Sequence, residues 1–510
     1  VETDQNMPNT ESLLRQIQYA REYLASVWGA EHFDVDFSPD TFGHGVHMPE
    51  IDRFGGVKYL YHCRGLGGET VLYRYRAPSG RELLAYREPY WYNGFVTPRM
   101  AAGIVELSRR CAGLKTGLIV YGVGDHGGGP TRRDVERALE MMSWKIYPKI
   151  RFGTFREFFL EAESVRDQLP VVEHELNFFA PGCYTTQSRI KRGNRRLEAK
   201  LRDTESLTAL AGEAAGFSPA PGPLRRAWQN VLFTHFHDIL TGSCVQDSRE
   251  YAMSLYQTAA ATADTRAQNA MRAIGEQIDT SSVPADADSY HTRSAGAGAG
   301  YGTEDFAGVP SPERGSGKTR VFHIFNTLPV RRSEVVPLTV WDWPGDLRCV
   351  RVEDCRHNPV ETQLLDASQQ QYWDHRYFRI LVDVTVPALG YTTLVLTQDT
   401  PESDPTYFRD FDRLSDFYDD PVLQNDRIRV AFDAETGRIR SLRGAADGRE
   451  LLAGGETAGL SYIETEAATS NAWNIGRSVR EIPVDRCVKL EKIASGPLRE
   501  SVRKRSFQAS

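Results

Sequence analysis

Hydrophobic positions near the start of the chain recur with the spacing of a helix. Over residues 10–28 apolar side chains are separated by three or four positions, and Gly29 follows as a stop signal, so this stretch predicts an amphipathic helix. Two short apolar runs, at residues 33–37 and 57–63, predict strands. The chain therefore begins with a helix followed by two strands.

The alternation of strand and helix continues to about residue 150. Residues 118–121 have the pattern of a buried strand, and a helix is predicted after Thr131, whose spacing from Asp134 is that of a capping box. Strands that alternate with helices predict an α/β layer. We therefore expect residues 1–150 to form an α/β domain.

Beyond Thr154 the pattern becomes helical. Thr154 and Glu157 have the spacing of a second capping box. Three long helical patterns follow, at residues 188–210, 223–240 and 247–278. Long helices with short joins predict a bundle, so residues 151–278 are interpreted as a three-helix middle domain.

The rest of the chain predicts a linker and then a β domain. Residues 279–318 are rich in Gly, Ala, Ser and Pro and cannot bury enough apolar surface to fold, which predicts a flexible linker. From residue 319 the hydrophobic period becomes two. Strands are expected at residues 321–326, 334–340, 377–384 and 391–396, and a hairpin at 427–432 with 438–442. We interpret residues 319–510 as a β-sandwich, with the acidic stretch 402–420 as a solvated loop.

Composition narrows the class of protein. A chain of 510 residues is too long for one hydrophobic core, so about three domains are expected. The formal net charge of −7 argues against a nucleic-acid partner, and no run approaches the roughly 20 apolar residues that a membrane-spanning helix needs. The seven cysteines have no CxxC spacing, which favours free thiols in a reducing compartment and hence a cytoplasmic location.

The glycine-rich stretch at residues 122–131 permits a first hypothesis, a dinucleotide site. Gly122, Gly124 and Gly127 have the spacing of the dinucleotide fingerprint between a predicted strand and a predicted helix. Asp125 would place negative charge inside the loop that must hold a pyrophosphate, and the acid expected about 20 residues later is absent. These two departures argue against nucleotide binding.

Carboxylates and histidines support a second hypothesis, a hydrolytic site with a metal. Asp40 and Asp125 each follow a predicted strand beside glycines, and glycoside hydrolysis requires a pair of carboxylates. His235, His237 and Asp238 lie at the end of a predicted helix, and histidine with carboxylates suits zinc. Helical periodicity places His235 and Asp238 on one face and His237 on another, so spacing alone pairs His235 with Asp238.

A third hypothesis is a binding or structural module without catalysis. Residues 189–202 contain seven basic side chains. At helical spacing these side chains are distributed around the helix. They therefore indicate a solvated face rather than an anion site.

Four stretches together resemble glycoside hydrolase family 38, the class II α-mannosidases. They are residues 39–44 (PDTFGH, with Met48-Pro49 after it), 122–131 (GVGDHGGGPT), 173–187 (beginning EHELN and ending YTTQ) and 236–243 (FHDILTGS). The resemblance covers essentially the whole chain, and the order of α/β layer, helical bundle and β-sandwich also fits. It implies that residues 1–150 are a catalytic domain that resembles part of a (β/α) barrel. It implies a retaining α-mannosidase that acts on terminal α-mannosides of glycans or oligosaccharides.

The resemblance also implies roles for individual residues. Asp40 would attack the anomeric carbon and bind a zinc ion, with His237, rather than His235, as the second ligand. Asp238 would contact sugar hydroxyls, and Asp125 would be the general acid/base. The zinc would bind two sugar hydroxyls and help to distort the ring. Further substrate contacts are implied for His44, Glu175 and Tyr184.

One feature of the family is missing from this sequence. The family takes two more zinc ligands from a His-x-Asp motif that would lie upstream of Val1, and its β region would continue beyond Ser510. His32 and Asp34 have the right letters, but they lie on the strand that leads directly to Asp40, so we interpret them as coincidence. We expect an internal portion of a longer α-mannosidase that binds metal weakly and turns over slowly or not at all. A carbohydrate-binding fragment is the alternative function, and a homo-oligomer is a further expectation.

Overall fold

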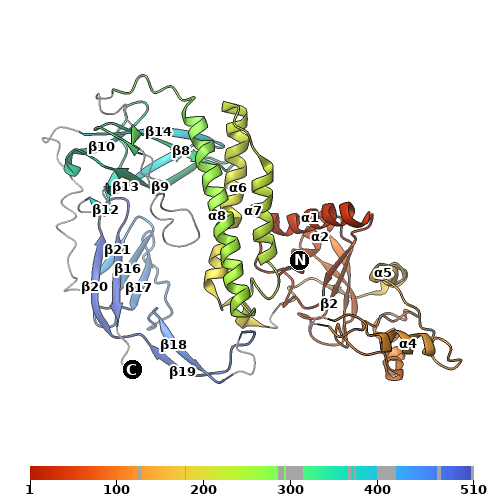
Figure 1. Cartoon of the computed structure of the whole chain (residues 1–510). Coiled ribbons are helices and arrows are strands. Elements are labelled where there is room, and N and C mark those ends of the chain that lie inside the picture. The colour runs from red at the N-terminus through yellow and green to blue at the C-terminus, as the bar shows by residue number, and fades with distance from the viewer. Residues whose placement is uncertain are drawn as a thin grey trace. The chain divides into compact units, whose positions relative to one another are not determined.

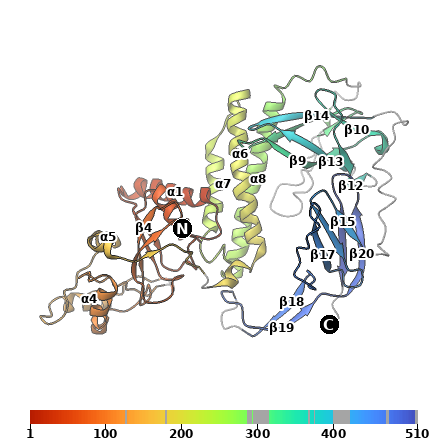
Figure 2. The same cartoon turned by 180° about the vertical axis from the view of Figure 1, so that it is seen from behind.

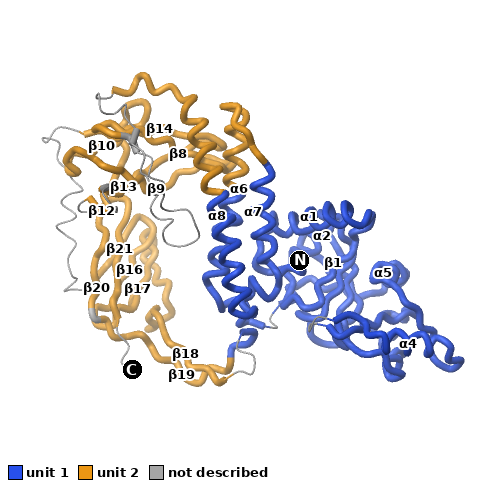
Figure 3. The backbone as a smooth tube through the Cα atoms, viewed as in Figure 1, with its two compact units in different colours: residues 1–201, 221–262, 468–475 blue, residues 202–220, 263–467, 476–510 orange. Residues whose placement is uncertain are grey.

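The computed structural model describes residues 1–124, 128–177, 180–284, 292–293, 314–365, 369–372, 375–398, 421–467 and 472–506. The chain divides into two compact units, which Figure 3 colours separately. Unit 1 contains residues 1–201, 221–262 and 468–475, and unit 2 contains residues 202–220, 263–467 and 476–510. The candidate acid/base Asp125, most of the predicted linker 279–318 and the acidic stretch 402–420 lie outside the described residues.

Unit 1 is built around a mixed sheet. Its strands are β1 (Val35–Ser38), β2 (Tyr59–His62), β3 (Leu72–Arg76), β4 (Glu82–Arg87) and β5 (Val171–Val172). They lie in the order β1-β2-β4-β3-β5, and only the β3–β4 pair is antiparallel among these described strands. The strands predicted at residues 33–37 and 57–63 are thus confirmed. The described part of the sheet is open, so the barrel-like layer stays a prediction.

The strand predicted at residues 118–121 is wrong. The chain there has no regular structure, and Gly122 forms a single bridge with Gly94. Leu118 and Val120 pack against the apolar core on one face of the sheet. The continuous apolar run therefore reflects the packing of an irregular segment and not a strand ladder.

Helices cover both faces of the sheet. They are α1 (Thr10–Trp28), α2 (Met48–Phe54), α3 (Ile104–Arg110), α4 (Arg132–Met141) and α5 (Phe155–Ala162), with short 3-10 turns η1 (Pro98–Ala101), η2 (Glu163–Gln168) and η3 (Pro181–Tyr184). Alternate strand residues face opposite ways. Leu60 packs with Leu13 of α1 and Ile51 of α2, whereas Tyr61 packs against Phe155 of α5 and the core on the other side.

Local capping signals set the ends of two predicted helices. In α1 the side chain of Asn9 accepts a hydrogen bond from the backbone of Ser12, and Gly29 closes the helix with a left-handed φ of 61°. In α5 the capping box between Thr154 and Glu157 forms as predicted. This helix packs on the sheet of unit 1, however, and not among the long helices.

Three long helices follow the sheet. They are α6 (Ser188–Ala215), α7 (Pro221–Thr234) and α8 (Gln246–Gly275), which lie side by side in Figures 1 and 2. Gly193 permits a close approach of α6 and α8, because a Cβ atom there would lie 2.9 Å from the ring of Tyr256. The boundary between the units falls within α6 and α8, so a separate bundle domain stays a prediction.

Two antiparallel sheets share the main apolar core of unit 2. One has the order β10-β14-β8, and the other contains β11, β13 and β12 with β9 on β13. These strands are β8 (Arg320–Asn326), β9 (Arg332–Trp341), β10 (Val350–Asp354), β11 (Thr362–Leu364), β12 (Gln370–Tyr372), β13 (His375–Val386) and β14 (Gly390–Gln398), with a 3-10 turn η6 (Leu347–Cys349). Phe378 and Ile380 of β13 pack with Val352 of β10 and Leu396 of β14. This arrangement agrees with the predicted sandwich and its first four strands.

Smaller sheets complete unit 2. They are formed by β15 (Val422–Gln424), β16 (Ile428–Phe432) and β17 (Ile439–Gly444), by β18 (Ser461–Thr465) and β19 (Ser478–Pro483), by β20 (Cys487–Ala494) and β21 (Ser501–Ser506), and by β6 (Thr292–Arg293) and β7 (Arg314–Gly315). The pairing of β16 with β17 confirms the predicted hairpin. All seven cysteines are unpaired, as predicted. None of the helices in the described part of the chain has both the length and the apolar character that crossing a membrane requires.

Candidate active site

Two charged side chains follow neighbouring parallel strands at the same edge of the sheet. Ser38 at the end of β1 is paired with His62 at the end of β2, and Asp40 and Arg64 each lie two residues further on. Ligands of open α/β sheets bind beyond the carboxyl ends of the strands. Arg64 Nε donates a 2.6 Å hydrogen bond to Asp40 Oδ1. The sequence analysis missed Arg64, although its position directly after the second predicted strand was a usable signal.

The other oxygen of Asp40 faces a histidine from a distant part of the chain. Asp40 Oδ2 lies 3.6 Å from His237 Nε2, and Asp238 Oδ2 lies 3.8 Å from the same nitrogen. The side chain of His237 is 5% exposed and that of Asp40 is 19% exposed. The structure therefore brings together three of the residues that the sequence analysis assigned to the site.

Glu2 orients both of these groups. Its carboxylate accepts a 2.9 Å hydrogen bond from the backbone N–H of Asp40, and its carbonyl oxygen accepts one of 3.1 Å from the backbone N–H of His237. His237 Nδ1 lies 3.2 Å from the same carbonyl oxygen. A carbonyl oxygen can only accept, so Nδ1 carries a proton and Nε2 is the nitrogen turned towards Asp40. Glu2 belongs to no motif, which is why sequence reasoning missed it.

The charges of the site keep Asp40 ionised. Burial alone would raise the pKa of Asp40, but its interaction with His237 and the positive charge of Arg64 lower that pKa below the usual value. Burial alone would likewise lower the pKa of His237, but Asp40 and Glu2 raise it. The carboxylate is thus available as a nucleophile or as a metal ligand at neutral pH.

The distance between Asp40 and His237 suits a shared zinc ion. Zinc bonds of about 2.1 Å in a tetrahedron separate two ligands by roughly 3.4 Å, close to the 3.6 Å observed. Within the described ranges, no group of three or more His, Cys, Asp or Glu side chains could hold a metal. Asp34, which matches the His-x-Asp ligand motif by letter, is instead paired with Arg156 at 3.1 Å. The residues present therefore fit a zinc ion as two of its ligands.

Aromatic rings surround the guanidinium group of Arg64. Its Cζ atom lies 5.5 Å from the ring centre of Phe42 and 4.8 Å from that of Trp91. Phe42 also meets His237 edge-on, with ring centres 6.1 Å apart. Trp91 has a φ of 119°, an unusual value for a residue other than glycine. The orientation of Arg64 is thus held by packing as well as by charge.

His235 is a structural residue. The helix α7 ends at Thr234, so helical spacing does not apply to the residues that follow. His235 is buried, and its Nε2 lies 2.6 Å from Asn194 Oδ1. Burial lowers the pKa of His235 to about 3. The pairing of His235 with Asp238 that spacing predicted is therefore wrong, and His237 occupies the site instead.

His44 is also enclosed by its neighbours. Its side chain is fully buried, and Nδ1 lies 2.5 Å from Gln5 Oε1. The ring packs edge-on against His62, with centres 5.0 Å apart. This placement suits a structural role beneath the strand ends rather than the predicted contact with substrate.

Glu175 and Tyr184 line a hollow beside the loop that follows Asp40. The hollow has a volume of about 430 Å³ and is lined in part by Asn6, Glu175, Asn177 and Tyr184. Asn177 donates a 2.8 Å hydrogen bond to Glu175, and Asn6 donates one of 2.7 Å to the hydroxyl of Tyr184. Polar groups that converge on a hollow are suited to binding a sugar, so the predicted roles of these two residues stay predictions.

Comparison with known proteins defines the class to which this site belongs. Residues 1–175 match the glycosyl hydrolases family 38 N-terminal domain, residues 179–274 match the alpha mannosidase middle domain, and residues 423–508 match the glycosyl hydrolases family 38 C-terminal domain. The chain therefore belongs to glycosyl hydrolase family 38.

Individual relatives agree with this assignment. The chain is 27% identical to alpha-mannosidase 2C1 of Homo sapiens over 89% of its own length and 37% of that protein. It is 30% identical to alpha-mannosidase G of Dictyostelium discoideum over 50% of its length and 24% of that protein. The chain thus spans less than half the length of these curated relatives.

The fold is also similar to that of a solved structure. An alpha-mannosidase from Enterococcus faecalis V583 matches with a TM-score of 0.65 and 17% identity, over 96% of this chain and 58% of that one. The mixed content of helices and several sheets is therefore that of a family 38 fold.

Proposed function

We propose that this chain is the core of a retaining α-mannosidase that removes terminal α-mannosides from glycans or oligosaccharides. The observation that carries the proposal is the environment of Asp40, whose Oδ1 is held by Arg64 and whose Oδ2 faces His237 at the edge of the sheet. The curated relatives are named as α-mannosidases, which supports mannose as the sugar that is released.

The reaction proceeds in two displacements. In the first, Asp40 attacks the anomeric carbon while an acid protonates the departing glycosidic oxygen, so the C–O bond to the leaving group breaks as a glycosyl ester with Asp40 forms. In the second, the conjugate base removes a proton from water, the water oxygen attacks the same carbon, and Asp40 leaves. Asp125 is the proposed acid and base on the strength of its motif alone.

The residues around Asp40 prepare it for this role. Arg64 lowers the pKa of Asp40 and fixes one oxygen, so the carboxylate enters the reaction charged and oriented. Ser243 donates a hydrogen bond to Asp238 Oδ1, and Asp238 Oδ2, which lies 3.8 Å from His237 Nε2, would accept one from a sugar hydroxyl. The side chain of Asp238 is 36% exposed, so a ligand can reach it.

Asp40 and His237 would also hold a zinc ion. When bound there, zinc would supply Lewis-acid chemistry that helps to stabilise an oxocarbenium-like transition state. His237 Nδ1 donates a hydrogen bond to the carbonyl oxygen of Glu2. Histidines that bind a metal through one ring nitrogen usually donate from the other nitrogen in this way.

Hydrolysis of an aryl α-mannoside by the purified chain tests the proposal. With zinc supplied we expect measurable hydrolysis that a chelator suppresses and that Asp40→Asn abolishes. Asp34→Asn is the matched control, because Asp34 lies on the same segment but pairs with Arg156. Binding of a mannoside without any hydrolysis would support a carbohydrate-binding fragment instead.

Titration calorimetry with zinc gives a readout that does not depend on turnover. The parent chain should bind zinc, and His237→Ala should bind it at least tenfold more weakly. Asn194→Ala, which removes the hydrogen-bond partner of His235, should leave binding unchanged. Equal binding by the parent and His237→Ala would contradict the proposed ligand.

A further inference from the structure

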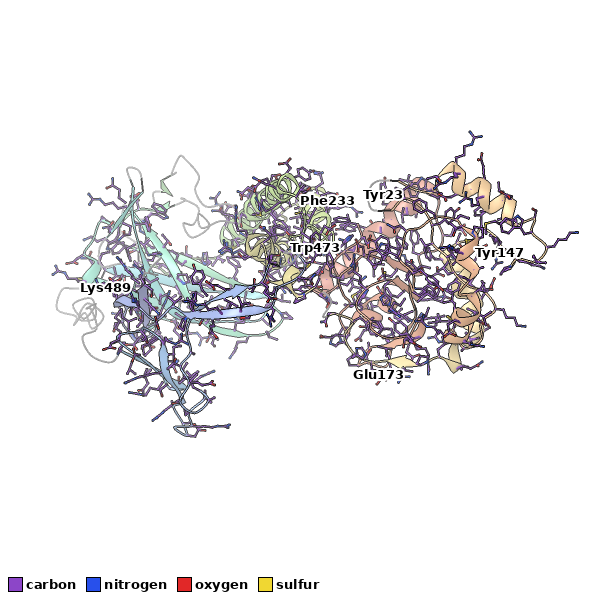
Figure 4. The ribbon with its side chains drawn as sticks, turned by 90° about the horizontal axis from the view of Figure 1, so that it is seen from below. Tyr23, Tyr147, Glu173, Phe233, Trp473 and Lys489 are labelled. Atoms are coloured by element: carbon purple, nitrogen blue, oxygen red, sulfur yellow. The ribbon has the colours of Figure 1, made fainter. Side chains whose placement is uncertain are left out.

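A short segment from the β region belongs to the unit that carries the site. Residues 472–475 lie between β18 and β19, and both of these strands are part of unit 2. The segment itself is part of unit 1. Its central residue is Trp473, which is labelled in Figure 4.

Backbone contacts fix this segment on η3. The N–H of Gly182 donates a 2.9 Å hydrogen bond to the carbonyl of Trp473, and Cys183 Sγ lies 3.7 Å from the carbonyl oxygen of Ala472. A Cβ atom on Gly182 would lie 2.9 Å from the carbonyl carbon and oxygen of Trp473. Only glycine therefore permits so close an approach without displacing the segment.

The side chain of Trp473 packs against a small cluster next to the nucleophile. The cluster consists of Phe42, Ala180 and Cys183, with Tyr184 also packed against it. Phe42 is 1% exposed and lies two residues after Asp40.

Phe42 connects this cluster to the charged groups of the site. The centre of the Phe42 ring lies 5.5 Å from Arg64 Cζ and 6.1 Å from the centre of the His237 ring. Arg64 and His237 face different oxygens of the Asp40 carboxylate. A shift of Phe42 would therefore disturb both sides of the carboxylate at once.

We propose that Trp473 is a positioning residue that holds Phe42 in place, so that a segment of the β region completes the catalytic site. This inference rests on the proposed function. Removing the indole leaves space beside the cluster that contains Phe42, and the Phe42 ring can then move away from Arg64 and His237. Misplacement of catalytic groups by about 1 Å can cost roughly 100-fold in rate.

Three substitutions in the full chain test this role. Trp473→Ala should lower kcat for an aryl α-mannoside by about 10- to 100-fold with little change in KM, because the ring acts on orientation and not on sugar binding. Trp473→Phe, which restores an aromatic ring, should recover most of the rate. Trp144→Ala is the control, since Trp144 is also in unit 1 and packs against Tyr147, away from the cluster.

A second readout does not require turnover. Cys183 is fully buried under the segment. Its rate of alkylation, followed by mass spectrometry, should rise in Trp473→Ala and in Gly182→Ala but not in Trp144→Ala. A parent-like kcat in Trp473→Ala, or an alkylation rate that is unchanged in both Trp473→Ala and Gly182→Ala, would overturn the inference. If the parent chain hydrolyses no mannoside, the proposed function fails, and alkylation of Cys183 alone then decides whether Trp473 secures the segment.

Discussion

Glu88 is a buried carboxyl group that should make the stability of unit 1 depend on pH. It follows β4, is 3% exposed, and accepts hydrogen bonds from the hydroxyl of Tyr61 (3.0 Å) and the backbone N–H of Tyr90 (3.1 Å). Burial raises the pKa of Glu88 from its usual 4.5 to about 7, because these two hydrogen bonds offset only part of the lost hydration. Its contribution to stability is therefore complete below pH 4.5 and is lost as the pH rises through about 7.

The size of the effect follows from the two pKa values. Subtracting 4.5 from about 7 leaves about 2.5 pH units, and at about 1.4 kcal/mol for each unit the free energy of unfolding changes by about 3 kcal/mol. Glu88→Gln keeps the shape and the hydrogen-bonding positions but cannot ionise. The variant should match the parent at about pH 4 and exceed its free energy of unfolding by up to about 3 kcal/mol at about pH 8.

Urea unfolding followed by tryptophan fluorescence at a series of pH values measures this difference. Glu31→Gln serves as the control, because Glu31 is exposed and the substitution makes the same change in charge. The difference between Glu88→Gln and the parent should grow with pH, whereas that of the control should stay flat. Parallel pH profiles for Glu88→Gln and the parent would refute the reasoning.

Three further substitutions follow from the described contacts. Arg64→Ala should lower kcat/KM for an aryl α-mannoside by about 10- to 100-fold, because a charge-assisted hydrogen bond to the nucleophile is lost. An unchanged kcat/KM in steady-state kinetics would mean that Arg64 is only a surface cation. Lys191→Met should lower the free energy of unfolding, measured in urea, by about 2–4 kcal/mol, because Lys191 donates hydrogen bonds to the carbonyls of Leu240 (3.2 Å) and Thr241 (3.1 Å). A loss below about 0.5 kcal/mol would contradict this role. Thr154→Ala should cost about 1 kcal/mol in the same assay by removing the cap of α5, and no loss would mean that the cap is unimportant.

Local signals allowed part of the fold and of the site to be predicted from the sequence. The bounds of α1 agree with its periodicity because Gly29 supplies a left-handed end that few other residues adopt. Asp40 was found because Pro39 and Gly43 mark the end of a strand, where α/β sheets bind ligands. The hairpin of β16 and β17 was similarly indicated by its short turn.

Long-range packing decided what the sequence could not show. The apolar pattern at residues 118–121 is the same for a strand and for an irregular segment that packs on a core, and only the fold distinguishes them. Spacing alone paired His235 with Asp238 because it could not show where α7 ends, whereas the family resemblance indicated His237. Glu2 and Trp473 come from opposite parts of the chain and reach the site through backbone contacts that no spacing reveals.

The most direct test of the central claim is to identify the carboxylate that forms the glycosyl ester. A fluorinated mannosyl fluoride, whose extra fluorine slows hydrolysis of the ester, should label the zinc-supplied chain once. Peptide mass spectrometry should then place the sugar on Asp40, and Asp40→Asn should take up no label. A label on another carboxylate, or equal labelling of Asp40→Asn and the parent, would contradict the account.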